Sequence, residues 1–121
     1  MNDREALEYI KGYFDELFVK KNVDALDHYL DKDYFDYDIG DPSVDHIQNS
    51  KQYLLRRFER EPTIGVNVVR AMIHEEVIAA FLEWFVVEGG ERRVTMKGVA
   101  SFLLRGEKIL KRHTFIYWRA E

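Results

Sequence analysis

The chain has 121 residues, of which 46% are hydrophobic and 33% charged, and its formal net charge is −4. This length suits one domain with a single core, and this composition excludes a disordered chain, so we expect one domain over residues 1–121. Without cysteine, disulfides, thiolate metal sites and cysteine nucleophiles are excluded, which fits a cytoplasmic location. The negative charge and the lack of a bilayer-length apolar run predict neither a nucleic-acid nor a membrane partner.

Three helices are predicted in the first half of the chain. Asn2 and Glu5 have the spacing of a capping box, and apolar residues then recur at helical spacing, which predicts a helix over 3–20. A short second helix is expected over 23–30, with Asn22 as its cap. A third is expected from a cap at Ser50, and Pro62 would stop it. Residues 34–38 read as a short strand edge, and residues 40–45 as a loop.

After Thr63 the apolar period changes from that of a helix to two. Four strands are predicted, over 66–74, 77–88, 92–104 and 108–119. Because the turns between them are short, the strands should form an antiparallel meander. The central strands are apolar on both faces, so both need covers. The helices can cover one face, and a second copy of the chain could cover the outer one, which predicts a homodimer.

No strong catalytic motif is present, and the four histidines are far apart in the sequence, so we expect no metal site and no cofactor. The aspartates of residues 31–41 lack the glycine and the terminal glutamate of a calcium loop, and Asp31, Asp33 and Asp41 are expected in a solvated turn. Asp36 and Asp38 alternate with two aromatic residues, so one pair should face inward. An inward carboxylate beside aromatic rings is desolvated, which raises its pKa and suits a general base.

Three segments together resemble one known family. They are NVDALDHYLDKDYFDYD (22–38), VRAMIHEEVIAAFLEW (69–84) and GVASFLLRGEKILKRHTF (98–115). They are similar to the second helix, the first long hairpin and the closing hairpin of the ketosteroid isomerase and SnoaL-like polyketide cyclase group, within the nuclear transport factor 2-like superfamily. The resemblance implies an α+β fold, in which three N-terminal helices pack in the concave face of a curved antiparallel sheet.

The resemblance also implies roles for individual residues. Asp38 occupies the place of the aspartate that moves the proton in ketosteroid isomerases, and Tyr13 best matches the tyrosine that donates to the oxyanion, with Phe14 as the rival alignment. The second, protonated aspartate of that oxyanion hole falls on Ala100, so steroid isomerisation is not expected here. In ketosteroid isomerase an apolar site raises the pKa of that second aspartate and keeps it protonated.

Alternation along the strands then predicts the rest of a pocket. If Ala100 faces inward, so does Phe102, and the small side chains at 98 and 100 would leave space. If the strand register slips by one residue, His113 replaces Arg112 in the pocket. Aromatic members of the set would also suit a packed core. The predicted ligand-binding residues are Tyr34, Phe58, Leu82, Trp84, Met96, Gly98, Ala100, Arg112, Thr114 and Ile116.

The sequence therefore predicts a dimeric protein with a mostly apolar pocket for a small apolar or aromatic organic molecule. Two functions stay open at this point. One is a cofactor-free isomerase or cyclase in which Asp38 is the base, with Tyr13 and Arg112 at the oxyanion. The other is a non-catalytic ligand-binding or protein-interaction module, since the same fold can host both.

Overall fold

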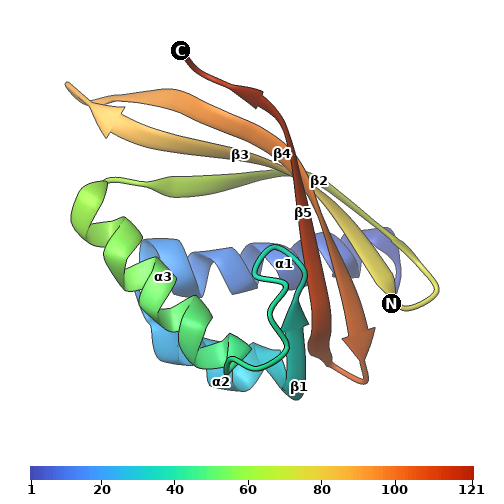
Figure 1. Cartoon of the computed structure of the whole chain (residues 1–121). Helices are drawn as coiled ribbons and strands as arrows, with labels where there is room; N and C mark the ends of the chain where they lie inside the picture. The colour runs from blue at the N-terminus through green and yellow to red at the C-terminus, as the bar shows by residue number, and fades with distance from the viewer.

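The computed structural model describes residues 1–121 and places three helical segments against the concave face of a curved five-stranded sheet (Figure 1). The strand order is β1-β5-β4-β3-β2. This is the α+β fold that the sequence predicts. The elements in chain order are α1 (Asp3–Phe14), η1 (Asp15–Val19), η2 (Val23–Ala25), α2 (Leu26–Tyr29), β1 (Leu30–Asp36), α3 (His46–Arg60), β2 (Gly65–His74), β3 (Val77–Glu88), β4 (Glu91–Arg105) and β5 (Lys108–Arg119).

The first helix begins with the predicted capping box. The Glu5 N–H donates to the Asn2 side chain, and the Asn2 N–H donates to the Glu5 carboxylate, both at 2.9 Å. These bonds satisfy two amides that a helix start leaves without partners. The helix continues as the π-helical turn η1, so the helical span agrees with the expected 3–20. None of the helices combines the length and the apolar character that a membrane crossing needs.

The starts of the other two helices differ from the prediction. The second is a single 3₁₀ turn followed by the four residues of α2, and the Asn22 side chain does not cap it but donates to Glu16 Oε2 at 3.4 Å. The third helix starts five residues earlier than expected. Asp45, not Ser50, is its cap, because the Asp45 carboxylate accepts the backbone N–H groups of Ile47 and Gln48 at 3.1 and 3.0 Å. The helix ends at Arg60, before Pro62, as predicted.

The last four strands form the predicted antiparallel meander. The segment expected at 34–38 is a longer strand, β1, which begins at Leu30, where the second helix was expected to end. It pairs with β5 in the parallel direction, so the sheet is mixed. Register shifts interrupt all three antiparallel ladders, and such irregularities increase the local twist and bend a sheet. The bend gives the sheet the concave face on which the helices pack.

The aspartates of residues 31–41 have structural roles. Asp31 is buried, and Arg105 at the end of β4 binds both Asp31 and Asp33, which ties β1 to the hairpin end. These bonds to Arg105, with the Asp33 N–H, lower the pKa of Asp31. Asp41 accepts from the N–H and the hydroxyl of Ser43. The expectation that Asp31 lies in a solvated turn was therefore wrong.

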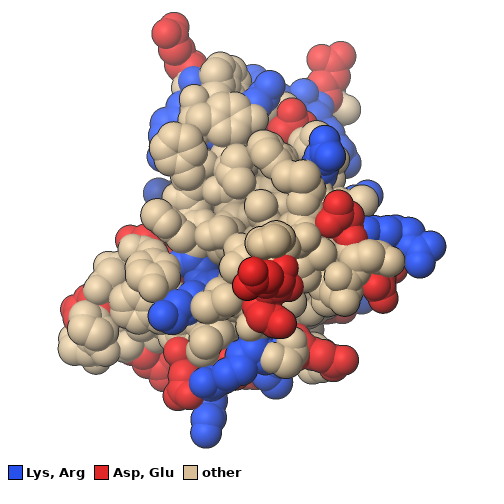
Figure 2. All heavy atoms as spheres, turned by 90° about the vertical axis from the view of Figure 1, so that its right-hand side faces the viewer, with Lys and Arg blue, Asp and Glu red and all other residues tan.

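The outer face of the sheet carries apolar side chains that no part of the chain covers. Phe81, Val99 and Phe115 are register partners on three adjacent strands, and Phe115 is 66% exposed. Figure 2 shows a broad uncharged area across the middle of the surface, with most charged side chains around it. Exposed apolar patches of this kind mark interaction surfaces in soluble proteins.

Candidate functional site

A cavity of about 510 Å³ lies between the helices and the concave face of the sheet. This volume is within the range of sites that hold drug-sized molecules. Side chains of α1, η1, α3 and strands β1, β3, β4 and β5, with the turn after β1, line it. The apolar part of the wall consists of Phe14, Leu17, Phe18, Leu26, Ile39, Leu54, Trp84, Met96 and Ile116.

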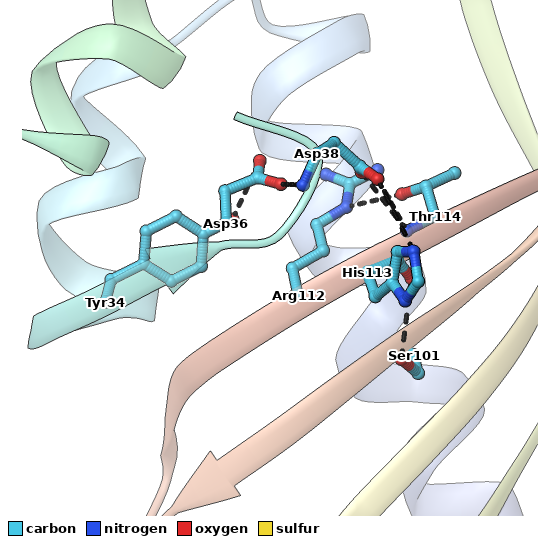
Figure 3. A network of polar contacts seen from close by, with 7 residues as sticks. All are labelled: Tyr34, Asp36, Asp38, Ser101, Arg112, His113 and Thr114. Atoms are coloured by element: carbon cyan, nitrogen blue, oxygen red, sulfur yellow. Dashed lines mark hydrogen bonds and ion pairs between the residues drawn. The ribbon is translucent and has the colours of Figure 1, made fainter. Parts of the chain in front are cut away.

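The polar part of the wall lies where β1 runs beside β5. Figure 3 shows Tyr34, Asp36 and Asp38 on one side and Arg112 and Thr114 on the other. β1 ends at Asp36, and the Tyr37 N–H still donates to the Arg112 carbonyl at 2.9 Å. The parallel pairing of β1 with β5 therefore brings two carboxylates and a guanidinium to the same cavity wall.

Asp36 is the more shielded of the two carboxylates. Its Oδ1 accepts the Asp38 N–H at 2.8 Å, and the Tyr34 hydroxyl donates to its Oδ2 at 3.4 Å. Burial raises the pKa of Asp36, although the Asp38 N–H and the positive charge of Arg112 oppose that effect. A carboxyl group whose pKa is raised by burial is a stronger base than an exposed one, which suits it to accept and return a proton.

Asp38 lies at the rim of the same cavity. Its side chain is 41% exposed, and the Thr114 N–H donates to its two oxygens at 3.1 and 3.3 Å. His113 Nε2 lies 4.0 Å from Asp38 Oδ1 on the solvent side. The shielding that the sequence predicts for an inward aspartate therefore falls on Asp36, because the chain turns away from the sheet directly after that residue.

Arg112 faces the cavity, and His113 points to the outer face with its side chain 65% exposed. The strand register is thus the one that puts the arginine inside. Arg112 Nε donates to the Thr114 hydroxyl at 3.2 Å, and the guanidinium carbon lies 5.3 Å and 5.8 Å from the ring centres of Phe102 and Phe14. These distances are typical of cation–π contacts.

Two tyrosine hydroxyls complete the polar wall. Tyr13 is 2% exposed, and burial raises the pKa of its hydroxyl against the opposing charge of Arg112. Burial also raises the pKa of Tyr34. Both side chains consequently stay protonated at neutral pH; the Tyr34 hydroxyl donates to Asp36, and the Tyr13 hydroxyl can donate a hydrogen bond to a ligand.

His46, the first residue of α3, holds the chain after β1 in place. It is buried, its Nδ1 accepts the Asp36 N–H at 2.9 Å, and its Nε2 lies 2.7 Å from the Asp41 carbonyl oxygen. This pair of contacts fits a neutral ring with its proton on Nε2, since one nitrogen must accept and the other donate. The histidine therefore supports the backbone of Asp36.

Most of the predicted site residues lie on the cavity wall. These are Tyr13, Tyr34, Asp38, Trp84, Met96, Arg112, Thr114 and Ile116. Phe58, Leu82, Gly98 and Ala100 do not line it. Leu82 and Ala100 are buried in the core, and Phe58 packs on Phe18. A Cβ at Gly98 would lie 2.9 Å from Ile116 and 3.3 Å from Trp84, so these neighbours already fill the space predicted there.

One face of α3 also lines the cavity, and its residues are not among those predicted from the sequence. The spacing of its residues by three or four is the only sequence signal that could have shown that they share a face. Within this face, the Arg57 guanidinium donates to the Tyr53 hydroxyl at 2.9 Å and pairs with Glu61. The face consists of Asn49, Ser50, Tyr53, Leu54 and Arg57.

No protein-family model and no curated protein matches the sequence. Solved structures do match the fold. A SnoaL-like polyketide cyclase from Agrobacterium tumefaciens is 14% identical, with a TM-score of 0.73 over 93% of this chain and 91% of that one. An LEH-like epoxide hydrolase from M. tuberculosis is 16% identical, with a TM-score of 0.63 over 95% and 84%. TsrD from Streptomyces laurentii is 15% identical, with a TM-score of 0.71 over 96% and 91%.

Identities this low establish the fold and leave the reaction open. The matches cover 84% or more of each chain, so the likeness extends over the helices and the sheet together. The chain has the nuclear transport factor 2-like fold, which it shares with the polyketide cyclase and the epoxide hydrolase.

Proposed function

We propose that the protein is a cofactor-free enzyme that moves a proton next to a carbonyl group of a small, mostly apolar organic molecule, as isomerases and cyclases do. One observation carries this proposal. The cavity places a shielded carboxylate, Asp36, on the same wall as a cation, Arg112, and two protonated tyrosines. A base beside donors that can stabilise an oxyanion is the arrangement that enolisation requires.

Either aspartate could be the base, and the geometry favours Asp36. Burial gives Asp36 a raised pKa, which brings proton transfer closer to neutral pH. Asp38, which the resemblance to ketosteroid isomerases proposes, is more exposed and accepts the Thr114 N–H. Arg112 and Tyr13 would stabilise the enolate oxygen. In this proposal Arg112 supplies the hydrogen-bond donor that the protonated second aspartate supplies in ketosteroid isomerases, because Ala100 occupies that position here and is buried.

Proton exchange of a bicyclic ketone tests the proposal without knowledge of the natural substrate. We expect the protein to accelerate deuterium exchange at the α-carbon of 2-tetralone in D₂O, measured by NMR. Asp36→Asn should slow the catalysed exchange by about 100- to 10,000-fold, the usual contribution of a general base. Asp38→Asn should have a smaller effect.

Glu59→Gln, on the exposed side of α3, is the matched control and should exchange at the wild-type rate. Circular dichroism of each variant shows whether the fold is kept. Wild-type activity in folded Asp36→Asn, or no acceleration by the wild type, would contradict this function.

For the outer face of the sheet we propose pairing with a second copy of the chain. The apolar strip of Phe81, Val99 and Phe115 supports this, since a dimer would cover the exposed Phe115 and its two partly buried neighbours. Sedimentation equilibrium should then give the mass of two chains, and Phe115→Glu should shift it to that of one. A single-chain mass for the wild type would contradict the dimer. It would instead favour the alternative in which this face binds a different protein.

A further inference from the structure

Arg112 carries a positive charge inside the fold without an ion-pair partner. Its Nε is bonded to the neutral Thr114 hydroxyl, and none of the ten ion pairs of the chain includes it. The cost of burying a charge is usually offset by a counter-charge. Asp36 and Asp38 are near enough to favour the charged guanidinium, as are Tyr13 and Tyr34, but neither carboxylate is in contact with it.

The surroundings of Arg112 orient it towards the cavity. The ring of the fully buried Phe102 lies 5.3 Å from the guanidinium carbon, and the ring of Phe14, on the cavity wall, lies 5.8 Å from it. The two Asp36 oxygens accept hydrogen bonds from the Asp38 N–H and the Tyr34 hydroxyl, and Asp38 accepts the Thr114 N–H. Both carboxylates thus have other partners, and the guanidinium retains N–H donors that can serve a ligand.

The other two cationic side chains of the cavity differ from Arg112, because one of them is ion-paired and the other is exposed to solvent. Arg57 pairs with Glu61, and Arg119 contacts the Met96 sulfur at 3.0 Å near the end of β5. The wall away from Arg112 is aromatic and aliphatic, with Leu26 and Trp84 among its members. A ligand that satisfies both ends of the cavity therefore has a flat apolar body and one anionic oxygen group, which a guanidinium binds in a bidentate manner.

We propose that Arg112 is the specificity residue of this cavity and selects aromatic or alicyclic carboxylates over neutral molecules of the same shape. The inference rests on the ligand-binding part of the proposed function and names its substrate class. It does not require the proton-transfer step.

Binding of two probes of matched shape tests the inference. We expect 2-naphthoate to bind the wild-type protein about 10- to 100-fold more tightly than 2-naphthylmethanol in calorimetry, which is the usual worth of a hydrogen-bonded charge. Arg112→Met should remove this preference and still bind the alcohol, because the apolar wall is unchanged. Arg112→Lys should keep part of the preference.

Arg56→Met, on the exposed side of α3, is the control and should keep the full preference. Equal binding of the two probes by the wild type, no binding of the carboxylate, or a full preference in folded Arg112→Met would each overturn the inference. Because the readout is affinity, a failure of the ketone-exchange assay leaves this result standing. Conversely, if the wild type accelerates deuterium exchange but binds the two probes equally, the enzyme proposal is supported and the selectivity of Arg112 is rejected.

Discussion

Replacement of Phe102 by alanine should lower the free energy of unfolding by about 3–5 kcal/mol, the usual cost of removing a fully buried aromatic ring. Phe102 on β4 is 0% exposed, and its ring meets the edges of Tyr13 and Phe14 at centroid distances of 5.9 Å and 6.4 Å. Its ring centre also lies 5.3 Å from the guanidinium carbon of Arg112, a cation–π contact beside the cavity. The substitution would leave a cavity in the core that the three helices and the sheet share.

Urea denaturation followed by circular dichroism measures this loss. Leu55→Ala, on the exposed side of α3, is the control, and a surface change of that kind should stay within about 0.5 kcal/mol. If Phe102→Ala costs no more than Leu55→Ala, the core does not centre on this ring.

Adding one methyl group at Gly98 should also destabilise the fold, by about 1–3 kcal/mol, the usual cost of overpacking. A Cβ at this position would lie 2.6 Å from the Phe115 carbonyl oxygen and 2.9 Å from the Ile116 side chain. The first of these atoms belongs to the backbone of β5, so β4 and β5 would have to separate. Since Ile116 and Thr114 line the cavity from β5, ligand binding should weaken as well.

Gly12→Ala is the matched control for Gly98→Ala. There the added Cβ meets only the Tyr29 hydroxyl, at 3.2 Å, which is the end of a side chain, and alanine favours the helix. Thermal unfolding of the two variants should therefore show a lower melting temperature for Gly98→Ala alone. Equal melting temperatures would mean that the β4–β5 pairing tolerates a side chain at this point.

The elements that the sequence predicted best are those with long periodic patterns. The four strands after Thr63 and the capped first helix have the expected extents within a few residues. The strand β1 was harder, because its partner β5 lies more than 70 residues later and parallel pairing gives no signal in the local sequence. The start of α3 was misplaced because Asp45 and Ser50 are both good caps, and the pattern alone does not choose between them.

The candidate site shows the same limit at the level of side chains. Alternation along β5 placed Arg112, Thr114 and Ile116 inward, and the structure agrees. The small residues at 98 and 100 predict open space, but Ile116 and Trp84 fill the space beside Gly98, and Ala100 is fully buried. Which neighbour fills such a gap depends on strand register and packing.

The choice between Asp36 and Asp38 depended on the turn after β1. Alternation puts the two aspartates on one side of a strand, but the strand ends at Asp36 and the chain then turns towards solvent. The contact of buried His46 with the Asp36 amide helps to fix that turn. No sequence pattern joins residues 36 and 46, because the contact depends on where α3 packs.

The titration of Asp36 tests the central claim most directly. Carbon-detected NMR of the side-chain carboxyl group follows its protonation, and Asp36→Asn identifies the resonance. The account predicts a pKa above the ordinary aspartate value of about 3.9, because the carboxylate is shielded in the cavity. A pKa at or below that value would show a solvated or ion-paired carboxylate, and would contradict both the shielding and the proposed role as base.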